Sequence, residues 1–269
     1  MPLENIKELE YNLKNIIKDY DALGLADFLC LPSKRLRPLI IFLVLRMLDL
    51  QITEKHKKLA LAVELLHSAT LIHDDILDDA ILRRGQKTLN KKFNSKLAVL
   101  GGDYLLSLAL NEIAQIENPK VLEIFSDNIK AMVSSEIDQY FARGELINLE
   151  EYLKKNINKT ALLFLSGVKS ALVISNYDNH LTEIENFVLN FGLAFQIIND
   201  LNSIEDDKNE IYTICNILGG TKNKPDCDII KMANEFVLEI IKKANSNLNF
   251  VDNKYKKELC EILLKLKEK

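Results

Sequence analysis

Apolar residues recur at helical spacing along most of the chain, and two stretches, 59–82 and 183–201, are apolar on almost every face. A helix that is apolar all round is a buried one, so we expect two central helices. Both stretches end in acidic or amide side chains, which suggests that their polar ends meet in one cavity. With the other periodic segments, the pattern predicts helices at residues 3–22, 37–50, 54–82, 95–115, 119–142, 149–155, 158–176, 181–203, 210–218, 227–247 and 252–268.

Composition predicts an all-α fold in one domain, 1–269. The 269 residues are 48% hydrophobic and 28% charged, which allows one domain with a substantial core. Nine glycines and five prolines leave few turn signals for many short strands. The formal net charge of −4 argues against a nucleic-acid-binding surface.

The cysteines and the beginning of the sequence lead us to expect a cytoplasmic protein. The four cysteines form no Cys-x-x-Cys or Cys/His metal pattern, so reduced thiols are the simplest account of them. The first residues show neither the basic nor the apolar part of a signal peptide, and no uncharged run approaches the roughly 20 residues that span a bilayer. We therefore expect at most peripheral membrane contact.

A cluster of aspartates ends the first of the two apolar stretches. Asp74 and Asp78 are four residues apart, so they should project from one face of the helix. Two carboxylates on one face are hard oxygen ligands suited to Mg²⁺, which also keeps waters and phosphate oxygens. A solvated helix end would also be acidic, but it would not follow a run as apolar as 65–72. Arg83 and Arg84 come soon afterwards, so the segment indicates a diphosphate-binding site.

Three cations stand at the expected start of another apolar helix. Lys34, Arg35 and Arg37 come just before Pro38, a residue well suited to a first helical turn. The N-terminus of a helix favours an anion. Alone, such a run is more typical of a charged surface; together with the aspartates and Arg83-Arg84 it indicates anion binding.

Seven motifs, taken in order, resemble those of the trans-prenyltransferases, the isoprenyl diphosphate synthases. Several independent motifs in one order are far more specific than any single one. They extend over roughly residues 30–213 and read Lys34-Arg35-Leu36-Arg37-Pro38, Glu64-Leu65-x-His67, His73-Asp74-Asp75-Ile76-Leu77-Asp78, Arg83-Arg84-Gly85-x-x-Thr88, Gly102-Asp103-Tyr104-Leu105-Leu106, Lys159-Thr160-Ala161-x-Leu163 and Phe195-Gln196-Ile197-Ile198-x-Asp200. The resemblance implies a normally dimeric protein with the all-helical isoprenoid synthase fold, a single-domain helical bundle around a central cavity.

The resemblance also implies a Mg²⁺-dependent condensation of isopentenyl diphosphate with an allylic diphosphate. It assigns metal binding to Asp74, Asp78, Asn199, Asp200 and Ser203. It assigns isopentenyl diphosphate to Lys34, Arg37, His67 and Arg84, and the allylic diphosphate to Arg83, Lys159, Thr160 and Gln196. Because metal ions and cations stabilise charge on a departing diphosphate, the residues expected to be catalytic are Asp74, Asp78, Arg83 and Lys159.

The second aspartate motif departs from the family pattern. Asn199-Asp200-Leu201-Asn202-Ser203 stands where Asp-Asp-x-x-Asp is usual, and Ile211 takes the place of a lysine. One metal should therefore bind more weakly, and the diphosphate loses cationic support. Asn199, Ser203 and Asp207 are four residues apart and also resemble the Asn/Ser/Glu metal triad of class I terpene synthases, since amide and hydroxyl oxygens can ligate a hard cation.

Three functions stay open: prenyl transfer, terpene cyclisation, and a catalytically silent partner in a hetero-oligomer with another prenyltransferase subunit. A cyclase needs no isopentenyl diphosphate, so the cations assigned to that substrate favour prenyl transfer. In the resembling family, bulky aromatics just before the first aspartate motif close the product tunnel early, whereas this chain has Leu66, Ala69 and Thr70 there. A chain could therefore grow towards Val63, roughly 16 Å along the helix from Asp74, and we expect a product of C20 or longer.

Overall fold

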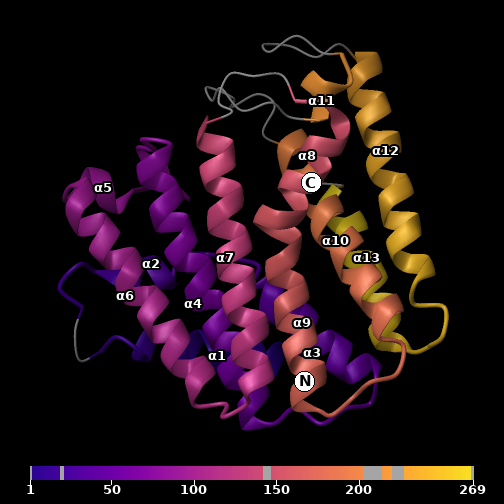
Figure 1. The fold of residues 1–269 in the computed structure, drawn as a ribbon, viewed down its shortest axis with the longest axis horizontal. Coiled ribbons are helices and arrows are strands. Elements are labelled where there is room, and N and C mark those ends of the chain that lie inside the picture. The colour runs from indigo at the N-terminus through magenta and orange to yellow at the C-terminus, as the bar shows by residue number, and fades with distance from the viewer. Residues whose placement is uncertain (1, 19–20, 142–146, 203–213, 220–226, 268–269) are drawn as a thin grey trace.

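The computed structural model describes residues 2–18, 21–141, 147–202, 214–219 and 227–267, and these form a bundle of helices (Figure 1). Strand structure in this part of the chain is limited to the antiparallel hairpin β1 (Leu82–Arg83) and β2 (Gln86–Lys87). The all-α prediction is confirmed. The helices are α1 (Pro2–Asn15), α2 (Leu25–Leu29), α3 (Leu36–Met47), α4 (Glu54–Leu77), α5 (Leu89–Lys92), α6 (Ser95–Ala114), α7 (Pro119–Phe141), α8 (Leu149–Asn156), the π-helical turn η1 (Ile157–Ala161), α9 (Leu162–Ile174), α10 (Leu181–Asn202), α11 (Ile214–Ile217), α12 (Cys227–Ser246) and α13 (Lys254–Lys267).

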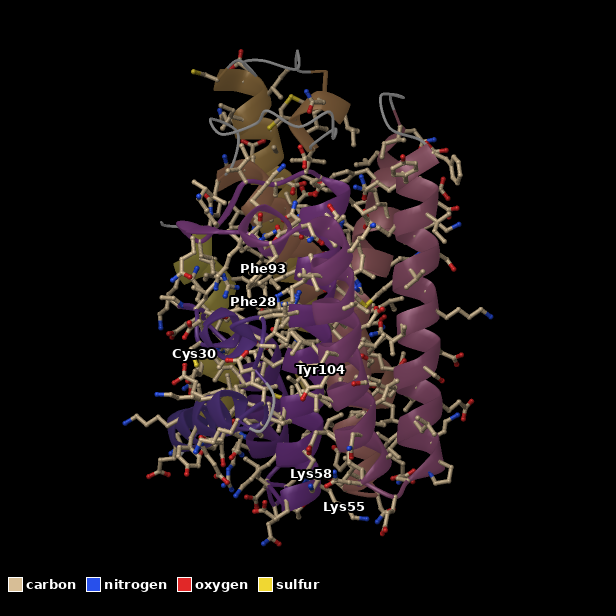
Figure 2. The ribbon with its side chains drawn as sticks, turned by 90° about the vertical axis from the view of Figure 1, so that its left-hand side faces the viewer. Phe28, Cys30, Lys55, Lys58, Phe93 and Tyr104 are labelled. Atoms are coloured by element: carbon tan, nitrogen blue, oxygen red, sulfur yellow. The ribbon has the colours of Figure 1, made fainter. Side chains whose placement is uncertain are left out.

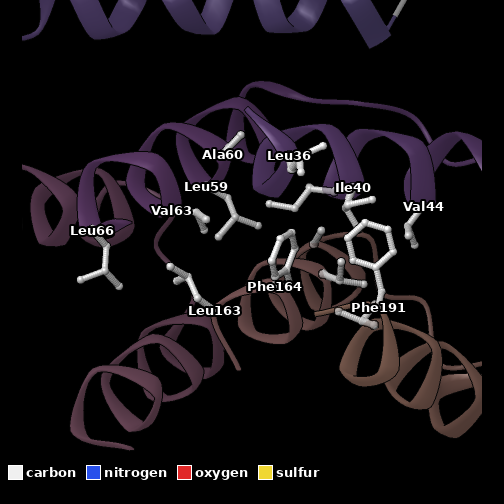
Figure 3. Close-up of a cluster of buried hydrophobic side chains, with 14 of the residues drawn as sticks. Leu36, Ile40, Val44, Leu59, Ala60, Val63, Leu66, Leu163, Phe164 and Phe191 are labelled. Carbon is white, nitrogen blue, oxygen red and sulfur yellow. The ribbon is translucent and has the colours of Figure 1, made fainter. Parts of the chain in front are cut away.

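The two helices predicted to be central, α4 and α10, contribute much of the core. Figure 3 shows Leu59 and Val63 of α4 facing Phe164 of α9, with Phe191 of α10 beside it. The rings of Phe164 and Phe191 meet edge to face, 5.5 Å apart between centroids, a favourable geometry for aromatic pairs. The apolar stretches therefore fix the framework that carries the polar ends of both helices.

The predicted helix 54–82 ends earlier, at Leu77, because the chain turns before it enters the hairpin. Asp79 has a left-handed backbone (φ 48°), which a continuing helix cannot include. Arg84 (φ 51°) and Gly85 (φ 80°) then form the two-residue turn of the hairpin, where positive φ at both positions matches the twist of the strands. The hairpin thus brings Arg83 and Arg84 back towards the end of α4.

A close approach between α10 and η1 sets the position of the second polar helix end. A Cβ atom added to Gly192 would lie 2.6 Å from the Cα atom of Ala161, so only glycine allows the two backbones to meet. The sequence predicted a break near residue 156, whereas the helix continues through the π-turn. A π-turn inserts one residue into a helix and is frequent at functional sites.

The outer helices cover the sides of the bundle. Figure 2 shows Phe28, Phe93 and Tyr104 along the side formed by α2, α5 and α6. By length and composition two helices could cross a membrane, Ser95–Ala114 and the continuous segment Leu149–Ile174, with 33% and 56% of their most apolar parts buried. Core helices of soluble proteins have the same length and composition, so these two are weak evidence for a membrane span.

Candidate active site

A cavity of about 970 Å³ lies between α4, α7, η1, α9 and α10. Asp74, Asp78 and Asn199 all line it, so the polar ends of the two central helices meet there, as the sequence predicts. Much of the remaining wall is apolar and comes from Leu71, Leu77, Met132, Val133, Ile137, Tyr140, Phe141, Leu163 and Phe195. The cavity thus combines a charged region with space for a hydrocarbon.

Asp74 lies in a carboxylate-rich part of this wall. Lys159 bridges two acids, with its Nζ 2.7 Å from Glu136 Oε2 and 3.7 Å from Asp74 Oδ2. Burial raises the pKa of Asp74 to about 6, Lys159 opposes the rise, and Glu136 and Asp78 add to it. Three carboxylates and one bridging ammonium leave surplus negative charge, which a further cation would offset.

Arg83 is held by Asp75, the aspartate between the two predicted metal ligands. Its Nη2 and Nε lie 2.5 Å and 3.0 Å from the same oxygen, Asp75 Oδ1. Asp75 is buried, and Asn90 donates a hydrogen bond to its backbone carbonyl. Asp75 therefore fixes Arg83 on the cavity wall and does not itself face the cavity.

A chain of hydrogen bonds connects α8, η1 and α10 beside the cavity. The hydroxyl of buried Tyr152 donates to Asp200 Oδ2, and Gln196 Nε2 donates to Asp200 Oδ1 at 2.8 Å. Thr160 Oγ1 in turn donates to Gln196 Oε1 at 3.0 Å. Thr160 and Gln196 line the cavity, whereas Asp200 does not. The structure therefore places Asp200, a predicted metal ligand, where it orients the Gln196 amide.

Cations predicted to bind isopentenyl diphosphate gather on another part of the wall. Arg37, His67 and Arg84 line the cavity together, and the Arg37 guanidinium lies 4.9 Å from the centre of the Phe164 ring. Burial lowers the pKa of Arg37 to about 10. The negative charge of Glu64 raises this pKa, and the positive charge of Arg84 lowers it further. Burial and the neighbouring arginines also hold the pKa of His67 well below its ordinary value, so this imidazole is neutral.

A buried ion pair between Arg35 and Glu64 lies next to this cation group. Arg35 Nη1 donates to Glu64 Oε1 at 2.8 Å, and both side chains are buried. Arg35, one of the three cations from which the sequence indicated anion binding, is therefore paired with a carboxylate of the protein and does not line the cavity. Lys34, predicted to bind substrate, is exposed and is not on the cavity wall.

Asp74 and Asp78 fit a hard divalent cation only if a ligand supplies further oxygens. No group of three His, Cys, Asp or Glu side chains is arranged to hold a metal within the described ranges. Mg²⁺ is usually bound by one or two carboxylates together with waters and substrate phosphates. The donor set is therefore that of a metal–diphosphate site. Ser203 and Asp207, and with them the terpene-synthase-like triad, lie outside the described residues.

The residues predicted to control chain length occupy different surroundings. Thr70 lines the cavity, whereas Leu66 and Ala69 are buried outside its wall. Val63 also lies in the core, where it packs near Gly167. On α4 the cavity wall extends back to His67, so the expected path towards Val63 is filled by core packing.

Three residues of this region had no role in the sequence analysis: Glu136, Tyr152 and Lys155. Glu136 is one acid within a long helix, and no spacing relates it to Asp74. Tyr152 looks like an ordinary core aromatic until Asp200 is placed beside it. Lys155 lies in a lysine-rich segment that is typical of a solvated surface. Only the packing of α8 and η1 on α10 brings Tyr152 and Lys155 to the site.

Known proteins match this chain over most of its length. A family model described as polyprenyl synthetase matches residues 24–252. A prenyl transferase from Cyanidium caldarium is 35% identical over 208 residues, 75% of this chain and 64% of the relative. Solanesyl-diphosphate synthase 2 from Oryza sativa subsp. japonica is 36% identical over 63% of this chain and 44% of the relative. The matches span less than two thirds of the length of both relatives.

A solved structure shares the fold. The polyprenyl synthase from Caulobacter crescentus, complexed with calcium and isoprenyl diphosphate, superposes with a TM-score of 0.82 at 22% identity. The superposition covers 98% of this chain and 94% of that one. The helical arrangement is therefore the one expected from the motifs.

Proposed function

The chain belongs to the polyprenyl synthetase family, and from this premise we propose that it is a Mg²⁺-dependent prenyltransferase. It condenses isopentenyl diphosphate with an allylic diphosphate into a trans-polyprenyl diphosphate of C20 or longer. The observation that carries the proposal is one cavity in which Asp74, Asp78, Lys159, Arg37 and Arg84 share a wall with apolar side chains. The names of the two curated relatives, a prenyl transferase and a solanesyl-diphosphate synthase, support this reaction.

Mg²⁺ is the ion that we propose for Asp74 and Asp78. When bound, it supplies a Lewis acid for the oxygens of the allylic diphosphate. The carboxylate pair and the raised pKa of Asp74 support a cation at this place. The calcium and isoprenyl diphosphate in the Caulobacter crescentus structure support a divalent ion as the class of metal.

The two diphosphates occupy different groups of side chains. Arg83, Lys159, Thr160 and Gln196 hold the allylic diphosphate, and the hydrogen bonds from Asp75 to Arg83 and from Thr160 to Gln196 keep these groups in place. Arg37, His67 and Arg84 hold isopentenyl diphosphate, with neutral His67 able to donate one hydrogen bond. Lys34, at the exposed end of this cation group, contributes to attraction of the substrate.

The reaction needs charge stabilisation and exclusion of water, and no protein nucleophile. The allylic C–O bond breaks, and its electron pair leaves with the diphosphate. The alkene of isopentenyl diphosphate attacks the allylic carbon, a C–C bond forms, and the carbon next to the new cationic centre loses a proton to the departed diphosphate. Lys159 and Arg83 stabilise the departing charge, while side chains such as Leu71, Leu163 and Phe195 keep water from the cationic carbon.

Incubation of the purified protein with Mg²⁺, labelled isopentenyl diphosphate and separate C5, C10, C15 and C20 allylic primers tests this function. Mass spectrometry should show elongated diphosphates of C20 or longer. Cyclic hydrocarbon from primer alone would identify a terpene cyclase instead. Product that forms only after addition of a second subunit would identify a silent partner in a hetero-oligomer. Asp78→Ala, which deletes a proposed metal ligand, should abolish elongation.

A further inference from the structure

Glu136 of α7 is an acid of the cavity wall that belongs to none of the sequence motifs. It lines the cavity together with Asp74 of α4 and Lys159 of η1. The side chains of Glu136 and Lys159 are largely buried, with 18% and 29% of their surface exposed. Three helical elements therefore bring charged side chains to one place on the wall.

Lys159 lies between two carboxylates at unequal distances. Its Nζ donates a charge-assisted hydrogen bond to Glu136 Oε2 at 2.7 Å, whereas its distance to Asp74 Oδ2 is 3.7 Å, too long for a hydrogen bond. Burial acts to lower the pKa of Lys159, but Asp74 and Glu136 together raise it above its ordinary value, so the side chain is charged. The ammonium is thus bonded to Glu136 and only close to Asp74.

An ammonium bonded directly to Asp74 would compete with a divalent cation for the same oxygen. A carboxylate oxygen that accepts a charge-assisted hydrogen bond must lose it before it binds a metal, and such bonds are roughly twice as strong as neutral ones. Mg²⁺ is usually held by only one or two carboxylates together with waters and phosphate oxygens. Because Asp74 and Asp78 are the two carboxylates proposed here, blocking one of them would weaken the metal site.

We propose that Glu136 is a positioning residue that holds Lys159 away from Asp74 and so keeps the Asp74 carboxylate available to the metal. The inference rests on the proposed function and adds a residue that the motifs do not assign. Lys159 remains on the cavity wall, where the allylic diphosphate is proposed to bind. Glu136 acts on metal binding only through Lys159.

The test combines Glu136→Gln with Lys159→Met in a double-mutant cycle. Gln keeps the size of the glutamate side chain and removes its charge, and Met removes the ammonium. Glu136→Asp keeps the charge.

Glu123→Gln is the matched control. Glu123 is also an acid of α7 that pairs with a lysine, Lys120 at 2.9 Å, but this pair is exposed and does not line the cavity. Inorganic pyrophosphate is titrated by calorimetry into each protein, with and without Mg²⁺. Circular dichroism checks the fold, and the KM for a C15 allylic diphosphate is measured at several Mg²⁺ concentrations.

We expect Glu136→Gln to raise the Kd for pyrophosphate roughly tenfold when Mg²⁺ is present, the effect of one charge-assisted hydrogen bond that now forms between Lys159 and Asp74. Without Mg²⁺ the Kd should not rise, because the variant removes a negative charge from the cavity wall. In the Lys159→Met background, Glu136→Gln should no longer weaken binding with Mg²⁺. Glu136→Asp should recover most of the affinity, and Glu123→Gln should resemble wild type.

Equal rises in the wild-type and Lys159→Met backgrounds would overturn the proposal, because Glu136 would then act on the metal without Lys159. A rise that is the same with and without Mg²⁺, or no rise at all, would overturn it too. If wild type binds pyrophosphate with Mg²⁺ but shows no prenyl transfer, the proposed function fails, and the titrations alone decide the role of Glu136. If Mg²⁺ does not improve pyrophosphate binding to wild type, the inference itself fails.

Discussion

Asp74 and Asp75 are consecutive residues with opposite surroundings. A helix turns by about 100° per residue, so Asp74 faces the cavity with Glu136 and Lys159 while Asp75 points into the protein and holds Arg83. The sequence predicted from spacing that Asp74 and Asp78 project from one face, and both line the cavity. It could not predict Glu136, because the contact depends on how α7 packs against η1.

Asp74→Asn should abolish turnover and raise the free energy of unfolding. Raising the pKa of a carboxyl from 3.8 to about 6 destabilises its ionised form by roughly 3 kcal/mol at pH 8, so the neutral amide should raise the free energy of unfolding by up to that amount. Turnover should fall to background. In wild type, turnover and Mg²⁺ affinity should decline as the pH falls through about 6, because Asp74 then takes up a proton.

Urea unfolding at pH 8 and at pH 4, with turnover measured from pH 5 to 8, checks this prediction. The stability gain of the amide variant should disappear at pH 4, where Asp74 is largely protonated in wild type. Asp138→Asn, at an exposed position of α7, is the control and should change neither quantity. Retained turnover in Asp74→Asn would contradict the site.

Thr70→Phe should shorten the product. Thr70 lines the cavity, so an aromatic ring there fills space that the growing chain needs. Ala69→Phe serves as the comparison, because Ala69 is buried outside the cavity wall; overpacking there should cost about 1–3 kcal/mol of stability and leave product length unchanged. Mass analysis of the products separates the two cases, and a shift in Ala69→Phe alone would show that the chain runs on the other side of α4.

The helices differ in how far the sequence determines them. The apolar stretches 59–82 and 183–201 predicted α4 and α10 because burial on every face leaves a continuous apolar pattern. The hairpin β1–β2 and the π-turn were not predicted, since four strand residues and one inserted residue change the periodicity too little to be seen. The chain of hydrogen bonds from Tyr152 through Asp200 and Gln196 to Thr160 depends on that inserted residue. The sequence therefore could not predict these contacts either.

The side chain of His56 connects the start of α4 to the end of α9 through hydrogen bonds. His56 is buried; its Nδ1 accepts a hydrogen bond from the backbone N–H of Thr53 at 3.0 Å, and its Nε2 donates to the carbonyl of Ala171 at 3.2 Å. Burial lowers the pKa of His56, and the Ala171 contact opposes this only in part. The neutral imidazole, which accepts at Nδ1 and donates at Nε2, is therefore the form that makes both hydrogen bonds.

Acidification should weaken the hydrogen bonds of His56 and lower the stability of the fold. Because the folded-state pKa of His56 lies below the unfolded value of about 6.5, its stabilising contribution is complete above pH 6.5 and is lost as the pH falls below it. His56→Gln should be less stable than wild type at pH 7.5 and should lose less stability between pH 7.5 and 5.5. Chemical denaturation at several pH values measures both slopes; parallel slopes would exclude His56 as the titrating group.

Gly192→Ala should damage both stability and activity. Its Cβ atom would lie 2.6 Å from a backbone atom of Ala161, so α10 and η1 must separate, at a cost of roughly 1–3 kcal/mol. The Thr160–Gln196 hydrogen bond should lengthen with them. Gly101→Ala is the control, since its Cβ atom would meet only side chains at 3.3 Å or more. Thermal melting and the KM for the allylic diphosphate report the two effects.

At the scale of the whole molecule, one surface is more apolar than a solvated face requires. Val99, Leu100 and Leu110 of α6 are 42%, 60% and 38% exposed, and none of them lines the cavity. Large exposed apolar patches usually mark interaction sites. The sequence predicted a dimer from family resemblance alone, and this surface supports the proposal that a second copy covers α6.

Leu100→Glu should therefore weaken self-association. A carboxylate in an apolar interface loses its hydration without gaining a partner, so the variant should behave as a monomer at concentrations where wild type is dimeric. Light scattering after size-exclusion chromatography measures the mass. Leu264→Glu places the same change on α13, where Leu264 is also exposed, and should leave the mass unchanged. A monomeric wild type would remove the basis for this interface.

Because of the π-turn η1, the geometry of the site depends on how many residues this segment has as well as on which residues they are. Tyr152 lies before the turn and Lys159 within it, and the two side chains reach different helices. Deleting one residue between them would restore an ordinary helix and rotate α8 by about 100° against α9, which would turn Tyr152 away from Asp200 while every side chain of the site remained in the sequence. In relatives of this chain, the count of residues between the tyrosine and the lysine should therefore vary less than the residues themselves.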